Sequence, residues 1–225
     1  MGDRIAKLEK NFETANNEQD FIKNIIKSIA KKLLVESIYP THEELRETTR
    51  EFMSSEHPDF LKKFKKNRWQ IYYEKNIAQL LLAKHRSIRK TLTARIKDAM
   101  FSVFSEFPSI NTSTKKSEIK KWKGMVSVKR YYDKLFQKVK MSESETYMSK
   151  IIRIVWKEKK NAPKMQVVYA ISICETILNP ENTIVQINEE TIKQVIIKHY
   201  IVILRRSRKF TKYYEGVILR NIIPD

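Results

Sequence analysis

The sequence predicts an all-α protein: a helical bundle with one long central helix over about 69–107 and a second, C-terminal helical part. Only three glycines occur among 225 residues, far below the roughly 7% usual in proteins, and tight hairpin turns depend on glycine. Apolar residues recur three and four positions apart along most of the chain, which is the period of a helix. Prolines and capping residues separate these segments.

The first segment, residues 3–36, predicts two helices, a short first one and a longer second one. The second has a continuous apolar stripe on one face. The stripe consists of Phe21, Ile22, Ile25, Ile26, Ile29, Leu33 and Leu34. We therefore expect the second helix to pack against the rest of the protein along this face.

Two start signals follow. Thr41 with Glu44 three residues later is the pattern of a capping box, which predicts a helix over about 42–53. Pro58 followed by Asp59 is typical of the first turn of another helix, where proline loses no hydrogen bond and an acidic group meets the positive end of the dipole.

The longest helical signal lies over 69–107, where neither glycine nor proline occurs. Its apolar residues, all at helical spacing, are Tyr73, Ile77, Leu81, Ile88, Leu92, Ile96, Ala99, Val103 and Phe107. The turn-forming run Pro108–Thr114 comes next. It predicts a boundary between an N-terminal helical part, 1–107, and a C-terminal helical part, 115–225.

In the C-terminal part, Gly124 suits the end of a helix, and Ser142 with Glu145 indicates a second capping box. Asn179-Pro180 predicts the end of the helical block that follows.

The last segment is ambiguous between helix and strand. Residues 184–187 are compatible with a short strand, and the β-branched run 195–204 fits a buried strand or a helix. Asn188 in front of two glutamates resembles an N-cap, which favours a helix.

The net charge of the chain lies in its middle. Residues 61–160 hold 27 Lys and Arg against 8 Asp and Glu, which equals the +19 of the whole chain. The flanking segments 1–60, 161–200 and 201–225 carry −3, −1 and +4. Positive charge concentrated in this way attracts polyanions, above all nucleic acid. The sequence therefore predicts a non-enzymatic nucleic-acid-binding protein, with DNA and RNA both left open as partners.

The predicted contacts are Lys and Arg side chains, which neutralise backbone phosphates. They are Lys62, Lys63, Lys65, Lys66, Arg68, Lys75, Arg86, Arg89, Lys90, Lys97, Lys116, Lys120, Lys121, Lys123, Arg130, Lys134, Lys138, Arg205, Arg206 and Arg208. One polar stripe of the predicted long helix carries four of these cations and Thr93, with Arg89 beside it; the four are Lys75, Arg86, Lys90 and Lys97. The stripe is either a phosphate-binding face or a solvated one. The clusters 62–68 and 205–209 also resemble nuclear-import signals, so we expect a nuclear location if the source is eukaryotic.

The segment from Lys115 to Lys138 is the favoured contact region, and within it Arg130, Lys134 and Lys138 are spaced four apart, which predicts one row on a helix face. Two short basic helices around Gly124 resemble a helix-turn-helix motif, although Lys120 stands where that motif prefers a small residue. Trp122, Tyr131 and Tyr132 either stack on bases or pack in the core, and aromatic residues at helical spacing are more often core.

Two other binding functions remain open. The long apolar stripe over 69–107 also fits a scaffold protein that pairs, or self-associates, through this helix. Peripheral membrane binding is less favoured, because the apolar stripes are expected to face a core.

Enzymatic function is not expected. No phosphate-binding, nucleophile-elbow or zinc-peptidase motif occurs, the four histidines are far apart, and no cofactor is expected. A metal-dependent nuclease built on Asp59 with Glu118 and Lys120 is not expected, because all three residues are predicted to lie on helices, whereas such sites usually converge from a strand pair. Cys174, the single cysteine, is expected in the core of an intracellular protein without a membrane span.

Overall fold

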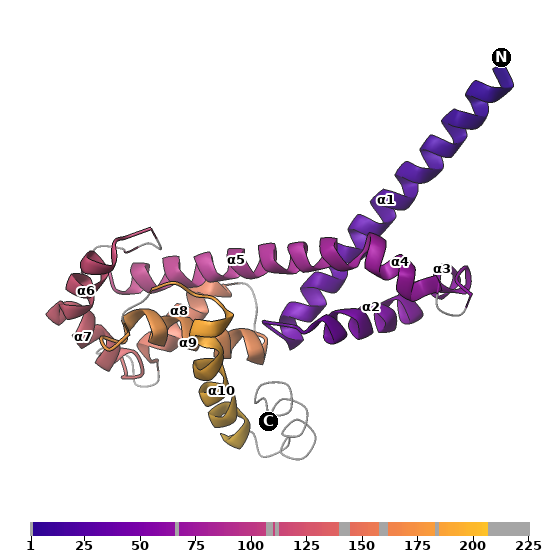
Figure 1. The fold of residues 1–225 in the computed structure, drawn as a ribbon. Coiled ribbons are helices and arrows are strands. Elements are labelled where there is room, and N and C mark those ends of the chain that lie inside the picture. The colour runs from indigo at the N-terminus through magenta and orange to yellow at the C-terminus, as the bar shows by residue number, and fades with distance from the viewer. Residues whose placement is uncertain are drawn as a thin grey trace. The chain divides into compact units, whose positions relative to one another are not determined.

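The computed structural model describes residues 2–65, 68–106, 110, 113–139, 145–157, 162–182 and 185–206, with side chains from Asn17 to Val202. These residues contain ten helices and no strand, which confirms the predicted all-α fold (Figure 1). The chain divides into two compact units, Met1–Lys90 and Thr91–Asp225, called here the N-terminal and C-terminal units. The division falls inside a helix, whereas the sequence placed a boundary near Pro108–Thr114.

The N-terminal unit begins with one long helix, α1 (Gly2–Glu36), where the sequence predicted two. No glycine or proline occurs between residues 3 and 39, so nothing in the chain interrupts the backbone hydrogen bonds. Its predicted apolar stripe is buried, except for Phe21, which is half-buried.

Helix α2 (His42–Glu56) begins with the predicted capping box. The Glu44 N–H donates to the Thr41 hydroxyl oxygen at 3.1 Å, and the Thr41 N–H donates to the Glu44 carboxylate at 2.7 Å. The short helix α3 (Pro58–Lys62) has Pro58 in its first turn, also as predicted.

The predicted long helix is interrupted. It consists of α4 (Arg68–Asn76) and α5 (Ala78–Val103), separated by a turn at Ile77. The side-chain amide of Asn76 donates to the Tyr72 carbonyl at 3.1 Å. Backbone hydrogen bonds of helical spacing still reach the turn from both sides: the Ile77 N–H donates to the Tyr73 carbonyl at 2.9 Å, and the Leu81 N–H donates to the Ile77 carbonyl at 2.8 Å.

The core of the N-terminal unit is formed by α1, α2, α4 and α5. Its buried members are Ile22, Ile25, Ile26, Ile29, Ala30, Leu33, Leu45, Met53, Tyr73, Ile77, Ala78 and Leu81. His85 is also fully buried, with its Nε2 3.3 Å from the Ser37 carbonyl. Burial, with a smaller effect from the Arg89 charge, lowers the pKa of His85 to about 4.

The C-terminal unit is arranged around α9. Its helices after α5 are α6 (Lys116–Gly124), α7 (Val126–Lys134), α8 (Tyr147–Val155), α9 (Lys164–Leu178) and α10 (Glu189–Arg206). Eleven of the fifteen residues of α9 are buried, and α9 contacts α7, α8 and α10 (Figure 1). A helix buried on all sides is typical of the centre of a core.

The segment that was ambiguous in the sequence is helical. Asn188 accepts a hydrogen bond from the Thr191 N–H at 2.9 Å, so it is the expected N-cap of α10. Residues 185–188 contain no strand. Helix α8 is capped by Thr146, which accepts from the Ser149 N–H at 3.0 Å; Ser142, the predicted cap, lies outside the described residues.

Candidate nucleic-acid interface

The strongest candidate surface is formed by α6 and α7, together with Lys115 before them, called here the α6–α7 hairpin (115–134). Each helix turns one apolar face inward: Ile119 and Trp122 are buried on α6, and Val128 and Tyr131 on α7. The predicted helix end at Gly124 is confirmed, and the Met125 N–H donates to the Trp122 carbonyl at 3.1 Å. Two short helices joined this tightly leave their other faces to solvent.

Those outer faces are strongly basic. The exposed cations of the hairpin are Lys115, Lys116, Lys120, Lys121, Lys129 and Arg130. Glu118 is the only acidic residue from 115 to 130, and none of the five lysines forms an ion pair with a described residue. Lys115 and Lys129 were not among the predicted contacts; Lys129 directly follows the inward-facing Val128, which could have indicated its outward direction.

Arg130 differs from these lysines because it has a partner. Its guanidinium pairs with Glu106 and lies over the Tyr131 ring, 5.4 Å from the centroid. A hydrogen bond from Tyr131, helped by the charges of Arg130 and Lys134, holds the pKa of the Glu106 carboxyl below its usual range. A phosphate would have to compete with Glu106 for this arginine.

Lys123 is not on the surface, contrary to its predicted role. It is 3% exposed, and its ammonium donates to the carbonyls of Ile177, of Thr176 at 3.1 Å and of Asn179 at 2.8 Å. The last carbonyls of a helix lack intrahelical donors and attract cations, so Lys123 caps the C-terminus of α9. The sequence could have indicated this burial, because Lys123 lies four residues after the apolar Ile119 and therefore on the same face of the helix.

The predicted row at 130, 134 and 138 is also not one helical face. Helix α7 ends at Lys134, which is half-buried. Lys138 is exposed beyond the helix, in an antiparallel bridge with Thr146. Trp122 and Tyr131 lie in the core rather than on a stacking surface.

The turn of the hairpin exposes two apolar side chains. Val126 is 81% exposed and Met125 is 39% exposed. They stand between Lys121 on α6 and Lys129 on α7, so the tip of the hairpin combines apolar groups with positive charge.

The cations of α4 and α5 are divided between surface and interior. Lys75, Arg86 and Lys90 are exposed. Arg89 is half-buried: it donates to the Ile38 carbonyl at 2.9 Å and lies 4.2 Å from the centroid of the Tyr39 ring.

The predicted stripe on this helix ends before Lys97, which is half-buried, and burial lowers its pKa. Thr93, expected on the same stripe, is hydrogen-bonded to the Tyr169 hydroxyl at 2.9 Å. The later part of α5 is therefore committed to the C-terminal core.

The two remaining basic clusters contribute less to a surface. Lys62 pairs with Asp59 at 2.8 Å, and the Lys63 ammonium lies over the Phe60 ring. Lys65 and Arg68 are exposed. The other predicted contacts in these clusters, namely Lys66, the side chains of Arg205 and Arg206, and Arg208, lie outside the described residues.

Among the described residues, no three His, Cys, Asp or Glu side chains are grouped so that they could hold a metal ion. No helix in this part of the chain is long and apolar enough to cross a membrane. Comparison of the chain with protein-family models, curated proteins and solved structures found no match.

Proposed function

We propose that this protein binds nucleic acid without catalysis, through backbone phosphates that contact the α6–α7 hairpin. The observation that carries the proposal is the group of exposed hairpin cations, of which the five lysines have no ion pair with a described residue. The hairpin holds only two acidic residues, Glu118 and Asp133, against six exposed cations, so most of its positive charge is not neutralised locally. Each lysine that neutralises a phosphate releases counterions, which favours binding.

The alternative function, pairing of the long helix with a partner helix, has less support. Its apolar stripe was the argument for it, but Tyr73, Ile77 and Leu81 are buried in the N-terminal unit, and Leu92 and Ile96 are buried as well. A stripe that already forms the core of its own chain does not offer a seam to a second helix.

The test is fluorescence anisotropy of the whole chain with labelled duplex DNA, single-stranded DNA and RNA over a series of salt concentrations. We expect micromolar or tighter binding near 100 mM salt. The logarithm of the binding constant should fall with the logarithm of salt, with a slope of about −0.9 per phosphate contacted on duplex DNA and about −0.7 on single strands.

Two matched variants locate the surface. Replacing Lys116, Lys120, Lys121 and Lys129 by Gln should reduce the magnitude of the slope by about 3 and weaken binding at least tenfold at low salt. The control replaces four exposed cations of α4 and α5, namely Lys75, Lys84, Arg86 and Lys90, and should change both quantities less. Absence of binding to all three nucleic acids, or equal losses in the two variants, contradicts the proposal. Circular dichroism checks that both variants remain folded.

A further inference from the structure

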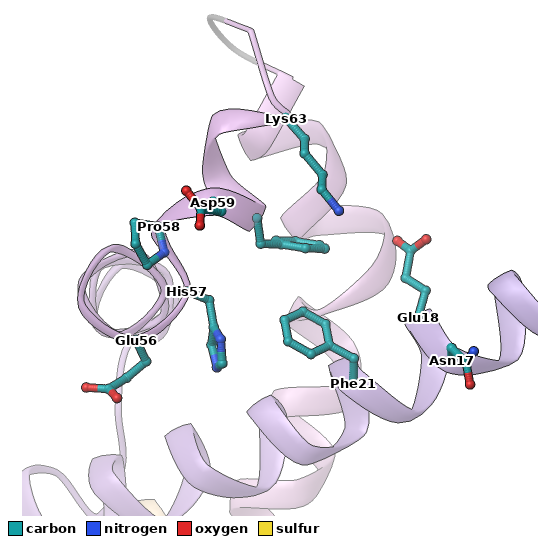
Figure 2. Close-up of a pocket in the computed structure, with 9 residues that line it drawn as sticks. Asn17, Glu18, Phe21, Glu56, His57, Pro58, Asp59 and Lys63 are labelled. Atoms are coloured by element: carbon teal, nitrogen blue, oxygen red, sulfur yellow. The ribbon is translucent and has the colours of Figure 1, made fainter.

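A pocket of about 490 Å³ lies in the N-terminal unit, between α1 and the junction of α2 with α3. It falls within the size range of small-molecule sites. Aromatic rings form one wall: the Phe21 ring lies 5.0 Å from the His57 ring at a near-perpendicular angle, and 5.1 Å from the Phe60 ring. Figure 2 shows the Phe21 and His57 rings facing each other across this wall. All three side chains are half-buried, so the wall is open to a ligand.

The charge of this pocket is opposite to that of the chain as a whole. Its lining contains three carboxylates, Glu18, Glu56 and Asp59, and one ammonium, Lys63. With His57 uncharged, the lining carries a formal charge of −2, in a protein whose net charge is +19. An anionic ligand would be repelled here, whereas a cation would be attracted by the carboxylate charges.

Glu18 is the carboxylate best placed to act on a ligand. It accepts a hydrogen bond from the Tyr72 hydroxyl at 2.7 Å, which fixes it beside the aromatic wall. Figure 2 shows the Glu56 side chain directed away from the rings. Asp59 already pairs with Lys62. Glu56 and Asp59 therefore contribute to the negative potential at longer range.

An ammonium group already occupies the aromatic wall. The Lys63 Nζ lies 5.4 Å from the centroid of the Phe60 ring, within the roughly 6 Å range of a cation–π interaction. Figure 2 shows Lys63 and Glu18 extending toward one another above the pocket. The Lys63 side chain is exposed and on a flexible stem, so a ligand with the same chemistry can replace it.

We propose that this pocket binds an organic cation, an alkylammonium or guanidinium group, which displaces Lys63 from the Phe60 ring and faces Glu18. The cation is either a free polyamine or the side chain of a lysine or arginine in another protein. The site is separate from the α6–α7 hairpin, and its occupation does not depend on nucleic-acid binding.

The test is NMR titration of the whole chain with choline, and with 3,3-dimethylbutanol as its neutral isostere. Protons held over an aromatic face move upfield, so the choline methyl signal should shift upfield with a dissociation constant of roughly 1 mM, while the isostere should bind at least tenfold more weakly. Spermidine and N-acetyl-lysine methylamide, titrated in competition with choline, distinguish the two sources. An equal response to the isostere overturns the proposal.

Three variants test the assignment of residues. Lys63→Met removes the internal competitor and should tighten choline binding about threefold or more. Glu18→Gln should weaken it about three- to tenfold through the lost charge, whereas Glu36→Gln, on the same helix but outside the pocket, should leave it unchanged. Phe60→Leu should abolish the upfield shift. This substitution also removes core packing, so if the Phe60→Leu variant does not fold, the Glu18 and Lys63 variants test the site instead. Weaker binding in Lys63→Met, or unchanged binding in Glu18→Gln, contradicts the proposed site.

Discussion

The cations of α4 and α5 and those of the α6–α7 hairpin look alike in the sequence, but the fold uses them differently. On α5, Arg89 reaches back to the Ile38 carbonyl, and Lys97 is half-buried. On the hairpin, most cations are exposed, whereas Lys123 is buried and Lys134 is half-buried. A basic stripe in a sequence is thus partly structural, and only the part without internal partners is available to a ligand.

The two kinds of cation can lie less than one helical turn apart. Lys121 and Lys123 are two residues apart on α6, and one is exposed while the other is buried. Arg86 and Arg89 are three apart on α5, with only Arg86 fully exposed. These pairs give matched substitutions that keep the chemical change constant and vary only the direction of the side chain.

The largest expected effect concerns His85, on the inward face of α5. Its pKa is about 4 in the folded protein and 6.5 when unperturbed. The unfolded chain therefore binds a proton more readily, and the stability of the N-terminal unit should fall as the pH drops from 6.5 to 4, by up to about 3 kcal/mol. Urea unfolding followed by Trp69 fluorescence measures this loss. The His85→Gln variant should not show this loss of stability, whereas His42→Gln, at an exposed position, should still show it. A pH dependence that is unchanged in His85→Gln contradicts its assignment to His85.

The second effect separates the two lysines of α6. Lys123→Met should lower the free energy of unfolding of the C-terminal unit by about 1–3 kcal/mol, because the carbonyls at the end of α9 lose a charged donor. Lys121→Met should change it by less than about 0.5 kcal/mol and should weaken nucleic-acid binding instead. Urea unfolding with Trp122 and Trp156 fluorescence, and anisotropy at fixed salt, provide the two readouts. If both variants lose stability, or both lose nucleic-acid binding, the proposed difference between Lys121 and Lys123 is wrong.

The third effect separates the two arginines of α5. Arg89→Met should destabilise the N-terminal unit by about 1–2 kcal/mol, since it loses a hydrogen bond and a cation–π contact. Arg86→Met should be close to neutral. Thermal unfolding by circular dichroism is sufficient to compare them. Equal melting temperatures would show that the contacts of Arg89 with Ile38 and Tyr39 contribute nothing.

The smallest effect concerns an inward-facing acid, Glu175 on α9. Hydrogen bonds from His199 and Lys198 of α10 lower its pKa to about 2 from the usual 4.5. The stabilisation is present above pH 4.5 and should be lost as the pH falls from 4.5 to 2. Glu175→Gln should remove this acid dependence. At pH 7 it should cost about 1 kcal/mol, less than the full effect of the charge, because the Gln amide oxygen can still accept a hydrogen bond from α10. Glu181→Gln, exposed and nearby in sequence, is the control; acid unfolding unaffected by Glu175→Gln would contradict the role.

Local signals in the sequence predicted the ends of helices better than their continuity. Thr41, Gly124 and Asn188 each end or begin a helix as expected, because caps and terminal glycines act through nearby backbone atoms. The break at Ile77 was not predicted, because no glycine or proline marks it in the sequence. The unbroken α1 was predictable, since nothing in its sequence forces an end.

The candidate interface was predictable as a region but not residue by residue. The charge density of the sequence pointed correctly to a basic surface around 115–134. The helical period alone would also have predicted that Lys123 faces inward. Arg130 could not be judged from the sequence, because its partner Glu106 is 24 positions away and only the fold brings the two together. The acidic pocket of the N-terminal unit had no sequence signal, as its aromatic and acidic residues come from separate segments.

The burial of α9 has a consequence for the single cysteine of the chain. Cys174 is fully buried, and burial raises the pKa of its thiol to about 12. The thiolate is the form that reacts with thiol reagents. In the closed structure the Cys174 thiol stays protonated and away from solvent, so it does not react. A thiol-specific reagent can then modify the protein only while the C-terminal unit is open. The rate of labelling at Cys174 would therefore report how often the C-terminal unit opens. The chain has no second thiol that could contribute to this signal.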